Sequence, residues 1–248
     1  MRKSIFSIIL RTNVNKVIHL GTGFFIGEDG IFFTVGHVFR KVEEEIIENR
    51  FENIFISFPS DESIFYRIID VWYESKDVYY QKGPTYKDTA VGKSDYKNNH
   101  YLIFNRLRPR LGEELELYGY HNIGQDIYHE MNNNNTANLS NVVFRQTPMT
   151  VDTYDSIISF SPVNPKLPKE KVSNRIKYNN CLTLDKKALI GESGSPIIDS
   201  LGLVSGVLIG STGGTNTSDM ILAKYCTKTI KYRTKYKTNI YKDLDYRL

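Results

Sequence analysis

Short apolar and aromatic runs, separated by turn-forming residues, recur along most of the sequence. They have the length and the β-branched and aromatic content of strands. The predicted strands cover residues 53–58, 63–73, 89–93, 101–104, 115–118, 141–144, 155–160, 196–198 and 203–209. Regularly spaced short strands without alternating helices favour an all-β barrel or sandwich over a fold of alternating strands and helices.

Two further apolar runs lie within residues 17–38, which read VIHLGTGFFIGEDGIFFTVGHV. The Asp29-Gly30 pair between them supplies residues that tolerate positive φ, so this segment predicts a tight hairpin. His37 is then expected on a loop just past a strand end. Residues 41–50, KVEEEIIENR, carry apolar positions at helical spacing and predict a short peripheral helix.

A basic, proline-containing stretch at residues 106–109 interrupts the strands and marks the predicted domain boundary. We therefore expect two β-rich halves, residues 1–108 and 109–225. A basic, tyrosine-containing tail or helix is expected over residues 226–248.

The composition is that of an ordinary globular protein. The chain has 248 residues, of which 40% are hydrophobic and 24% charged, and its formal net charge is +4; general disorder is thereby excluded. The apolar run at residues 5–10 is too short for a signal peptide or a membrane span, so we expect a cytoplasmic protein without membrane association. Cys181 and Cys226 form no CxxC pair, which predicts two buried, inert thiols. No metal or cofactor is expected.

The sharpest chemical signal is GESGSP, residues 191–196. A serine between glycines, followed by a proline-led apolar strand, predicts a tight turn that exposes a hydroxyl. Glycine at position 191 permits a strained backbone in which the amides of Gly191 and Ser193 point together. Such a pair makes an oxyanion hole, which stabilises the charge that develops during acyl transfer by about 3 kcal/mol per donor.

Ser193 needs a base within hydrogen-bond reach. The five histidines are His19, His37, His100, His121 and His129, so all of them precede the serine. This order excludes the α/β-hydrolase arrangement of serine, acid and then histidine. His37 is the best candidate, because it follows an apolar strand that a rigid scaffold can hold in position.

The base in turn needs a carboxylate that holds its second nitrogen. Asp88 leads directly into the apolar strand DTAVGK, which places it at a partly buried strand mouth. Asp95 lies in a segment typical of a solvated turn, and Asp70 lies within an alternating strand. Asp88 is therefore preferred as the acid.

In chain order, the segments GTGFFI, TVGHVF, KDTAVGK and GESGSP resemble the motifs of the chymotrypsin-like (trypsin-like) serine peptidases, especially their bacterial trypsin-like and HtrA-like branch. The resemblance implies two six-stranded antiparallel β-barrels with the active site in the cleft between them. It also implies a serine endopeptidase that cleaves protein or peptide substrates through an acyl-enzyme, with His37, Asp88 and Ser193 as the triad.

Three positions depart from the family's pattern. Glu192 stands where the secreted digestive enzymes use an aspartate to bind a newly cut amino terminus, so activation of that kind is not expected here. Thr89 follows the acid in place of an apolar residue. Gly36 precedes the base where most relatives have alanine.

The resemblance also suggests a pocket for the side chain that precedes the scissile bond. Lys187, six residues before the nucleophile, would lie at its bottom, and Ile209, Gly210 and Ser211 would form one wall. A lysine there favours an acidic or small apolar side chain, unless Lys187 points to solvent. A preference for arginine would instead direct attention to Asp185.

Two other interpretations stay open. The protein could be a protease-like scaffold that binds a peptide without cleaving it. The lysines, arginines and tyrosines after residue 224 could contact nucleic acid, although a solvated tail or a terminal helix is favoured. Because a broadly active cytoplasmic peptidase would damage its host, restricted selectivity or gating by a regulatory protein partner is also expected.

Overall fold

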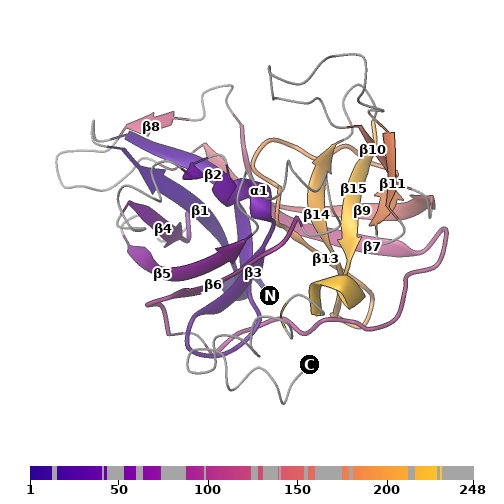
Figure 1. Cartoon of the computed structure of the whole chain (residues 1–248), viewed down its shortest axis with the longest axis horizontal. Coiled ribbons are helices and arrows are strands. Elements are labelled where there is room, and N and C mark those ends of the chain that lie inside the picture. The colour runs from indigo at the N-terminus through magenta and orange to yellow at the C-terminus, as the bar shows by residue number, and fades with distance from the viewer. Residues whose placement is uncertain are drawn as a thin grey trace.

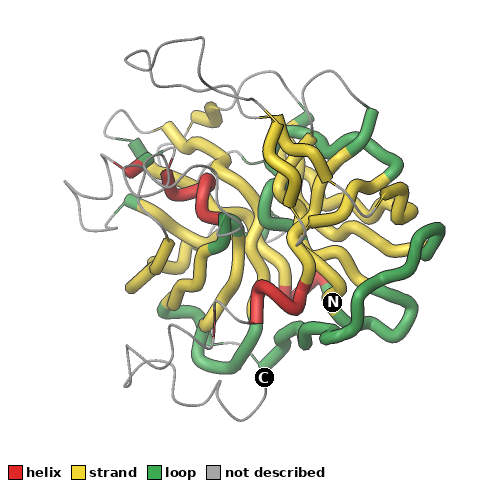
Figure 2. Tube along the Cα trace, turned by 45° about the vertical axis from the view of Figure 1, so that its right-hand side comes forward, coloured by secondary structure: helices red, strands yellow, loops and turns green. Residues whose placement is uncertain are grey.

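The structure is a computed structural model in which the placed residues form two β-barrels side by side (Figure 1). It describes residues 1–12, 16–40, 42–43, 53–59, 64–73, 88–97, 99–123, 128–130, 139, 141–153, 156–159, 175–178, 181–211, 216–227 and 230. Figure 2 shows how strands account for most of both halves, with helical segments confined to short pieces.

The first barrel contains six antiparallel strands. They are β1 (Ile5–Arg11), β2 (Lys16–Phe25), β3 (Ile31–Thr34), β4 (Ile54–Ser57), β5 (Phe65–Tyr73) and β6 (Ala90–Ser94). The order is β1-β4-β5-β6-β3-β2, and the pairing of β2 with β1 closes the sheet. A short 3-10 turn, η1 (Arg2–Ser4), precedes β1, and the helix α1 (Gly36–Arg40) follows β3.

The second barrel is also closed and six-stranded. Its strands are β7 (Glu114–Asn122), β9 (Val142–Thr153), β12 (Cys181–Leu184), β13 (Pro196–Ile198), β14 (Val204–Ser211) and β15 (Ser218–Leu222). They follow the order β12-β15-β14-β13-β7-β9. A separate ribbon pairs β10 (Ser156–Ser159) with β11 (Arg175–Tyr178). The predicted all-β double barrel is therefore confirmed.

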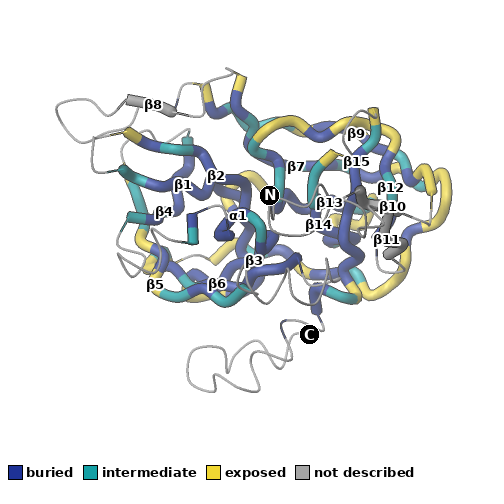
Figure 3. The backbone as a smooth tube through the Cα atoms, turned by 45° about the horizontal axis from the view of Figure 1, so that its top comes forward, coloured by how far each residue is buried: buried dark blue, intermediate teal, exposed yellow. Residues whose placement is uncertain are grey.

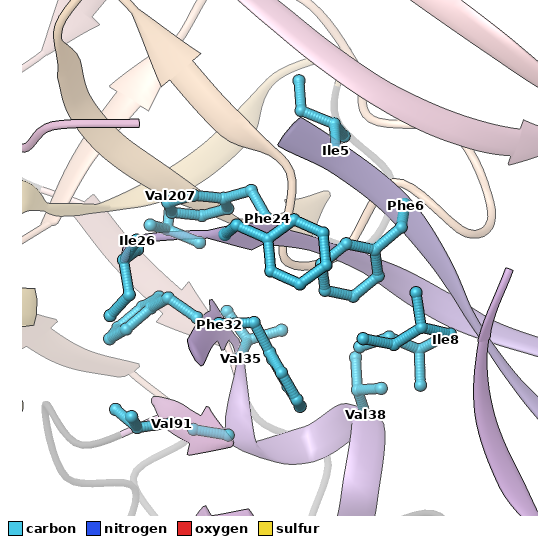
Figure 4. Close-up of a cluster of buried hydrophobic side chains, with 14 of the residues drawn as sticks. Ile5, Phe6, Ile8, Phe24, Ile26, Phe32, Val35, Val38, Val91 and Val207 are labelled. Carbon is cyan, nitrogen blue, oxygen red and sulfur yellow. The ribbon is translucent and has the colours of Figure 1, made fainter. Parts of the chain in front are cut away.

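Phenylalanine side chains fill the first barrel (Figure 4). Phe6, Phe24 and Phe32 are fully buried, and the rings of Phe6 and Phe32 meet edge to face with their centroids 5.5 Å apart. Burying a side chain of this size contributes about 1.5–3 kcal/mol. Val207 of β14 joins the same cluster from the second barrel. The core is thus continuous across the junction of the barrels, which gives the site between them a rigid base.

Several predicted elements match the structure, and others need correction. The hairpin predicted around Asp29-Gly30 is present as β2 and β3, and both turn residues have positive φ, 58° and 76°. The apolar run at residues 5–10, considered only as a targeting segment, is the core strand β1. His37 lies in α1 rather than on a loop. Residues 101–104 make an isolated bridge rather than a strand, because Phe104 pairs only with Val204.

The connections between the halves cross over. Strand β8 (Tyr128–Glu130), which follows β7, pairs with β2 of the first barrel. Conversely, Phe104 bridges to Val204 of the second barrel. Figure 3 shows the strands of both barrels largely buried, with exposed positions concentrated in peripheral connections. Backbone pairings therefore cross the boundary that is expected near residue 108.

Two expectations fall largely outside the described residues. Of the helix predicted over residues 41–50, only residues 42 and 43 are described, and of the tail predicted over 226–248, only 226, 227 and 230. Residues 223–227 are helical. Within the part of the chain that the structure describes, no helix is long and apolar enough to cross a membrane.

Candidate active site

The GESGSP segment forms a tight loop before β13. Gly191 and Gly194 have φ values of 95° and 90°, which an L side chain adopts only with strain. The Ser195 amide donates to the Glu192 carbonyl at 3.0 Å and closes the turn around Ser193. The predicted glycine turn that presents Ser193 is therefore present.

Space, as well as backbone geometry, requires glycine on both sides of Ser193. A Cβ atom on Gly191 would lie 2.4 Å from Cε1 of His19. A Cβ atom on Gly194 would lie 2.1 Å from the carbonyl oxygen of Thr22 and 2.1 Å from Oγ1 of Thr34. The serine loop is thus pressed against the first barrel.

The peptide that carries the Gly191 amide is anchored from β7. The Asn122 amide donates to the Ile190 carbonyl at 3.0 Å. Because the C=O and N–H of a trans peptide point in opposite directions, this bond turns the Gly191 N–H away from β7. Among the described residues, neither the Gly191 nor the Ser193 amide donates a hydrogen bond. Both amides are thus available to a substrate carbonyl.

Thr22 of β2 joins the serine loop to the first barrel. Its amide donates to the Ser193 carbonyl at 2.9 Å, and its hydroxyl donates to the Gly191 carbonyl at 3.0 Å. The same hydroxyl accepts from the Tyr120 amide at 3.0 Å. Sequence reasoning missed this role of Thr22. Its position within GTGFFI was the available signal.

His37 and Asp88 are brought together by α1 and by the residues that lead into β6. The His37 Nδ1 atom lies 2.7 Å from Oδ2 of Asp88, and the His37 backbone amide donates to Oδ1 at 2.8 Å. Asp88 is buried, whereas a quarter of the His37 side chain is exposed. These two bonds fix the orientation of the imidazole, and Nε2 is the ring nitrogen that does not contact Asp88.

Arg40 is a third partner of this pair that the sequence analysis missed. Its Nη2 donates to Oδ1 of Asp88, and its side chain is 7% exposed. Burial alone would raise the pKa of Asp88, but His37 and Arg40 together hold that pKa well below its usual range. Asp88 is thus kept ionised beside the imidazole.

Gly21 lies between Val38 of α1 and the Ser193 carbonyl. A Cβ atom on Gly21 would lie 2.7 Å from the side chain of Val38, which follows His37, and 2.9 Å from the Ser193 carbonyl. The end of α1 and the serine loop therefore approach the same point. The Ser193 hydroxyl itself donates to the Ile209 carbonyl at 3.0 Å. Among the described residues, it makes no hydrogen bond to His37.

The two competing aspartates are elsewhere. Asp95 is exposed in the turn after β6, and Asp70 is half-buried in β5. Neither takes part in the hydrogen bonds of His37.

Glu192 lies between the two amide-bearing residues and is fully buried. Its Oε2 accepts from the Leu189 amide at 2.6 Å, and its Oε1 lies 3.2 Å from Nη1 of Arg145 on β9. Burial raises the pKa of Glu192, and the bonds to Leu189 and Arg145 oppose that rise. The Glu192 carboxylate is thus paired with Arg145 of the same chain. This pairing fits the expectation that Glu192 does not bind a newly cut amino terminus.

The residues predicted to form a side-chain pocket are only partly together. The Ser211 hydroxyl donates to the Ala188 carbonyl at 3.0 Å, so the end of β14 touches the segment around Lys187. The Lys187 side chain itself is exposed. Asp185 is also exposed and accepts from the Thr150 amide at 2.7 Å, which makes it a structural cap.

A carboxylate that the sequence analysis did not single out lies beside this wall. Asp219 of β15 is 3% exposed and pairs in register with Gly210. Thr183 donates to its Oδ1 at 3.0 Å. A Cβ atom on Gly210 would meet nothing within 4 Å among the described residues, so the wall beside Asp219 is open there.

The two cysteines are free and buried. Burial raises the pKa of Cys181 far above its usual range, with Asp219 and Asp88 adding to the rise, and burial likewise raises that of Cys226. Both are therefore neutral thiols, which fits the prediction that neither is a nucleophile.

No protein-family model matches the sequence, and no curated protein matches it significantly. Solved structures do resemble the fold. The active form of the Rv3671c protease of M. tuberculosis is 17% identical with a TM-score of 0.60, covering 93% of this chain and 80% of that one. A Glu endopeptidase is 14% identical with a TM-score of 0.59, covering 94% and 91%. The MamO protease domain of Magnetospirillum magneticum is 13% identical with a TM-score of 0.57, covering 92% and 96%.

At these identities the likeness concerns architecture. The alignments cover nearly the whole of this chain, which itself forms two antiparallel barrels of six strands. The chain therefore has the chymotrypsin-like double-barrel fold.

Proposed function

We propose that the protein is a serine endopeptidase in which His37, Asp88 and Ser193 hydrolyse peptide bonds. The observation that carries this proposal is the pair of His37 and Asp88, which two hydrogen bonds join, with His37 on a helix that meets the glycine turn of Ser193 at Gly21. The pair comes from the first barrel and the serine from the second. The fold shared with solved proteases supports the same activity.

The first step is proton transfer from Ser193 to His37. Substrate binding turns the hydroxyl from the Ile209 carbonyl towards Nε2 of His37, a rotation about a single side-chain bond. The serine oxygen attacks the scissile carbonyl carbon as Nε2 takes the proton. Asp88, bonded to Nδ1, holds the tautomer and stabilises the imidazolium.

The negative charge on the former carbonyl oxygen is then bound by the amides of Gly191 and Ser193, each contributing about 3 kcal/mol. His37 returns the proton to the leaving amine, and the acyl-enzyme forms. A water molecule activated by the same imidazole hydrolyses the ester and regenerates Ser193. No metal or cofactor takes part in this sequence.

For the substrate we propose a basic side chain before the scissile bond. The preference for an acidic side chain depends on a lysine at the bottom of a pocket, but Lys187 is an exposed residue, and water and salt screen an exposed charge. The buried carboxylate of Asp219 lies next to the open wall at Gly210. A lysine or arginine of the substrate would add a cation beside this carboxylate, to which Thr183 already donates.

The alternative is a scaffold that binds peptides without cleaving them. Hydrolysis of a peptide library and of an unfolded protein separates the two. The wild-type protein should produce new amino termini, and Ser193→Ala or His37→Ala should lower the rate about a thousandfold or more. Peptide binding without turnover in the wild-type protein would favour the scaffold.

A further inference from the structure

Arg40 lies at the end of α1 and directs its guanidinium back towards the start of the helix. It contacts the same Asp88 oxygen, Oδ1, that accepts the His37 amide. Both charged side chains are largely buried, with exposed fractions of 7% for Arg40 and 10% for Asp88. A permanent cation is thus in direct contact with the acid of the triad.

The sequence makes room for this cation at Gly36. A Cβ atom on Gly36 would lie 2.6 Å from Nη1 of Arg40, well inside contact distance, and 3.2 Å from Oδ1 of Asp88. Residues four apart lie on the same face of a helix, so Arg40 passes directly over Gly36. The guanidinium occupies the space that an alanine methyl group would fill.

We propose that Arg40 is a positioning residue of the catalytic site, whose guanidinium holds the Asp88 carboxylate in place against His37. Gly36, in this account, is the glycine that admits Arg40. The inference rests on the proposed peptidase function and adds a fourth, charged member to its triad.

The physical reason is charge balance in a buried place. With neutral His37, the charges of Arg40 and Asp88 offset each other. A proton on His37 adds a second cation next to one carboxylate, and Arg40 repels that cation. The same contact restrains the Asp88 carboxylate, because Oδ1 accepts from Arg40 while Oδ2 is hydrogen-bonded to Nδ1 of His37.

Other ionisable groups lie around this unit. Burial raises the pKa of Tyr73 on β5 to about 12, and its neighbour Glu43 adds to the rise while Arg40 opposes it. On the side of β12, Cys181 is a neutral thiol near Asp88 and Asp219. Among the described residues, Arg40 is therefore the permanent cation in contact with Asp88.

The test compares kcat/KM against pH for four variants. Arg40→Met keeps the aliphatic stem and removes the charge, so it should lower kcat about tenfold or more and move the acid-side midpoint of the profile upward, because the cation that repels a protonated His37 is gone. Arg40→Lys should have a midpoint close to that of the wild-type protein, because the charge is kept. Gly36→Ala should displace the guanidinium and move the midpoint in the same direction. The double variant Gly36→Ala/Arg40→Met should be no worse than Arg40→Met alone.

The exposed Arg110 supplies the matched control. Arg110→Met removes an arginine charge that takes no part in the bonds to Asp88, so it should change neither kcat nor the acid-side midpoint. An unchanged midpoint in Arg40→Met would overturn the proposal. So would a Gly36→Ala effect that adds in full to that of Arg40→Met. Arg40→Lys and Gly36→Ala retain the charge and keep the test available if Arg40→Met does not fold.

A second measurement does not depend on turnover. The ring Cε1–H signal of His37, identified by its absence in His37→Gln, can be titrated by NMR in the wild-type and Arg40→Met proteins. A titration midpoint at higher pH in Arg40→Met than in the wild-type protein supports the role of Arg40. Coincident titration curves contradict it. If the wild-type protein cleaves no peptide, the proposed function fails while this titration still decides the role of Arg40.

Discussion

The backbone amide of Thr22 donates to the carbonyl of Ser193 across the junction of the two barrels, at 2.9 Å. The bond places the nucleophile relative to the scaffold that carries His37. The hydroxyl of the same threonine bonds the Gly191 carbonyl. Thr22 of β2 therefore holds two carbonyl groups of the loop, those of Gly191 and Ser193.

Thr22→Val should keep the side-chain shape and lose the hydroxyl. The Gly191 carbonyl and the Tyr120 amide would then be buried without their partner, a cost of about 1–3 kcal/mol in the free energy of unfolding. We also expect kcat to fall about tenfold, because the loop loses its register. Ser94→Ala, which removes a buried hydroxyl bonded to Gly30 in the first barrel, is the control. If both variants lose stability but keep kcat, Thr22 has no part in placing the loop.

Asp88→Asn should reduce activity severely, whereas Asp95→Asn should have little effect because Asp95 is exposed. Stability supplies a second readout. The native pKa of Asp88 lies below the ordinary value of 3.8, so its ionised form stabilises the fold above that pH, and this contribution disappears as the pH falls. Thermal denaturation between pH 2 and 7 should therefore show a weaker acid dependence in Asp88→Asn. Exchanged phenotypes of the two variants would reassign the acid.

Glu192→Gln should show the opposite pH dependence. The native pKa of Glu192 is raised, so stability is lost as the pH rises through that value and the buried carboxyl ionises. The variant should therefore gain melting temperature relative to wild type between pH 4 and 7, while its activity falls because Leu189 and Arg145 lose a charged partner. In Arg145→Gln the loss of stability with pH should be steeper than in wild type. A difference in melting temperature that is constant with pH would contradict this account of Glu192.

The sequence allowed the fold class and the central residues to be predicted because each carries a local signal. Ser193 stands between glycines whose positive φ the structure confirms, and the Asp29-Gly30 turn determines the hairpin of β2 and β3. Asp88 could be ranked above Asp95 because the neighbours of Asp88 are apolar and those of Asp95 are polar.

Features that depend on long-range contacts could not be predicted. Arg40 reaches Asp88 across 48 positions, and Arg145 reaches Glu192 across 47. Arg145 is not close in sequence to a predicted site residue, and although Arg40 follows His37 by three positions, nothing in the sequence shows that it turns back to Asp88. The pocket position of Lys187 has a related weakness, since counting back from Ser193 gives a position but not whether the side chain is buried, and Lys187 is exposed. The sequence shows that Gly36 stands where most relatives have alanine. Only the structure shows why, because the Arg40 guanidinium occupies the space that an alanine methyl group would need.

Substrate preference can be tested with short peptides that differ only in the residue before the scissile bond. We expect arginine and lysine to exceed glutamate, leucine and alanine in kcat/KM, because the carboxylate of Asp219 is buried beside the open wall. Asp219→Asn should reduce that preference at least about tenfold, and Lys187→Ala should leave it unchanged. A preference for glutamate that disappears in Lys187→Ala would restore the original interpretation of Lys187.

The central claim is that Ser193 is the residue that becomes acylated, and covalent labelling tests it most directly. A fluorophosphonate should react with the wild-type protein at close to one label per chain, and mass spectrometry of the digest should place the label on Ser193. Labelling should be abolished in Ser193→Ala and slowed about a thousandfold in His37→Ala, because the hydroxyl then lacks its base. Label on another residue, or equal labelling of the wild-type and Ser193→Ala proteins, would contradict the account.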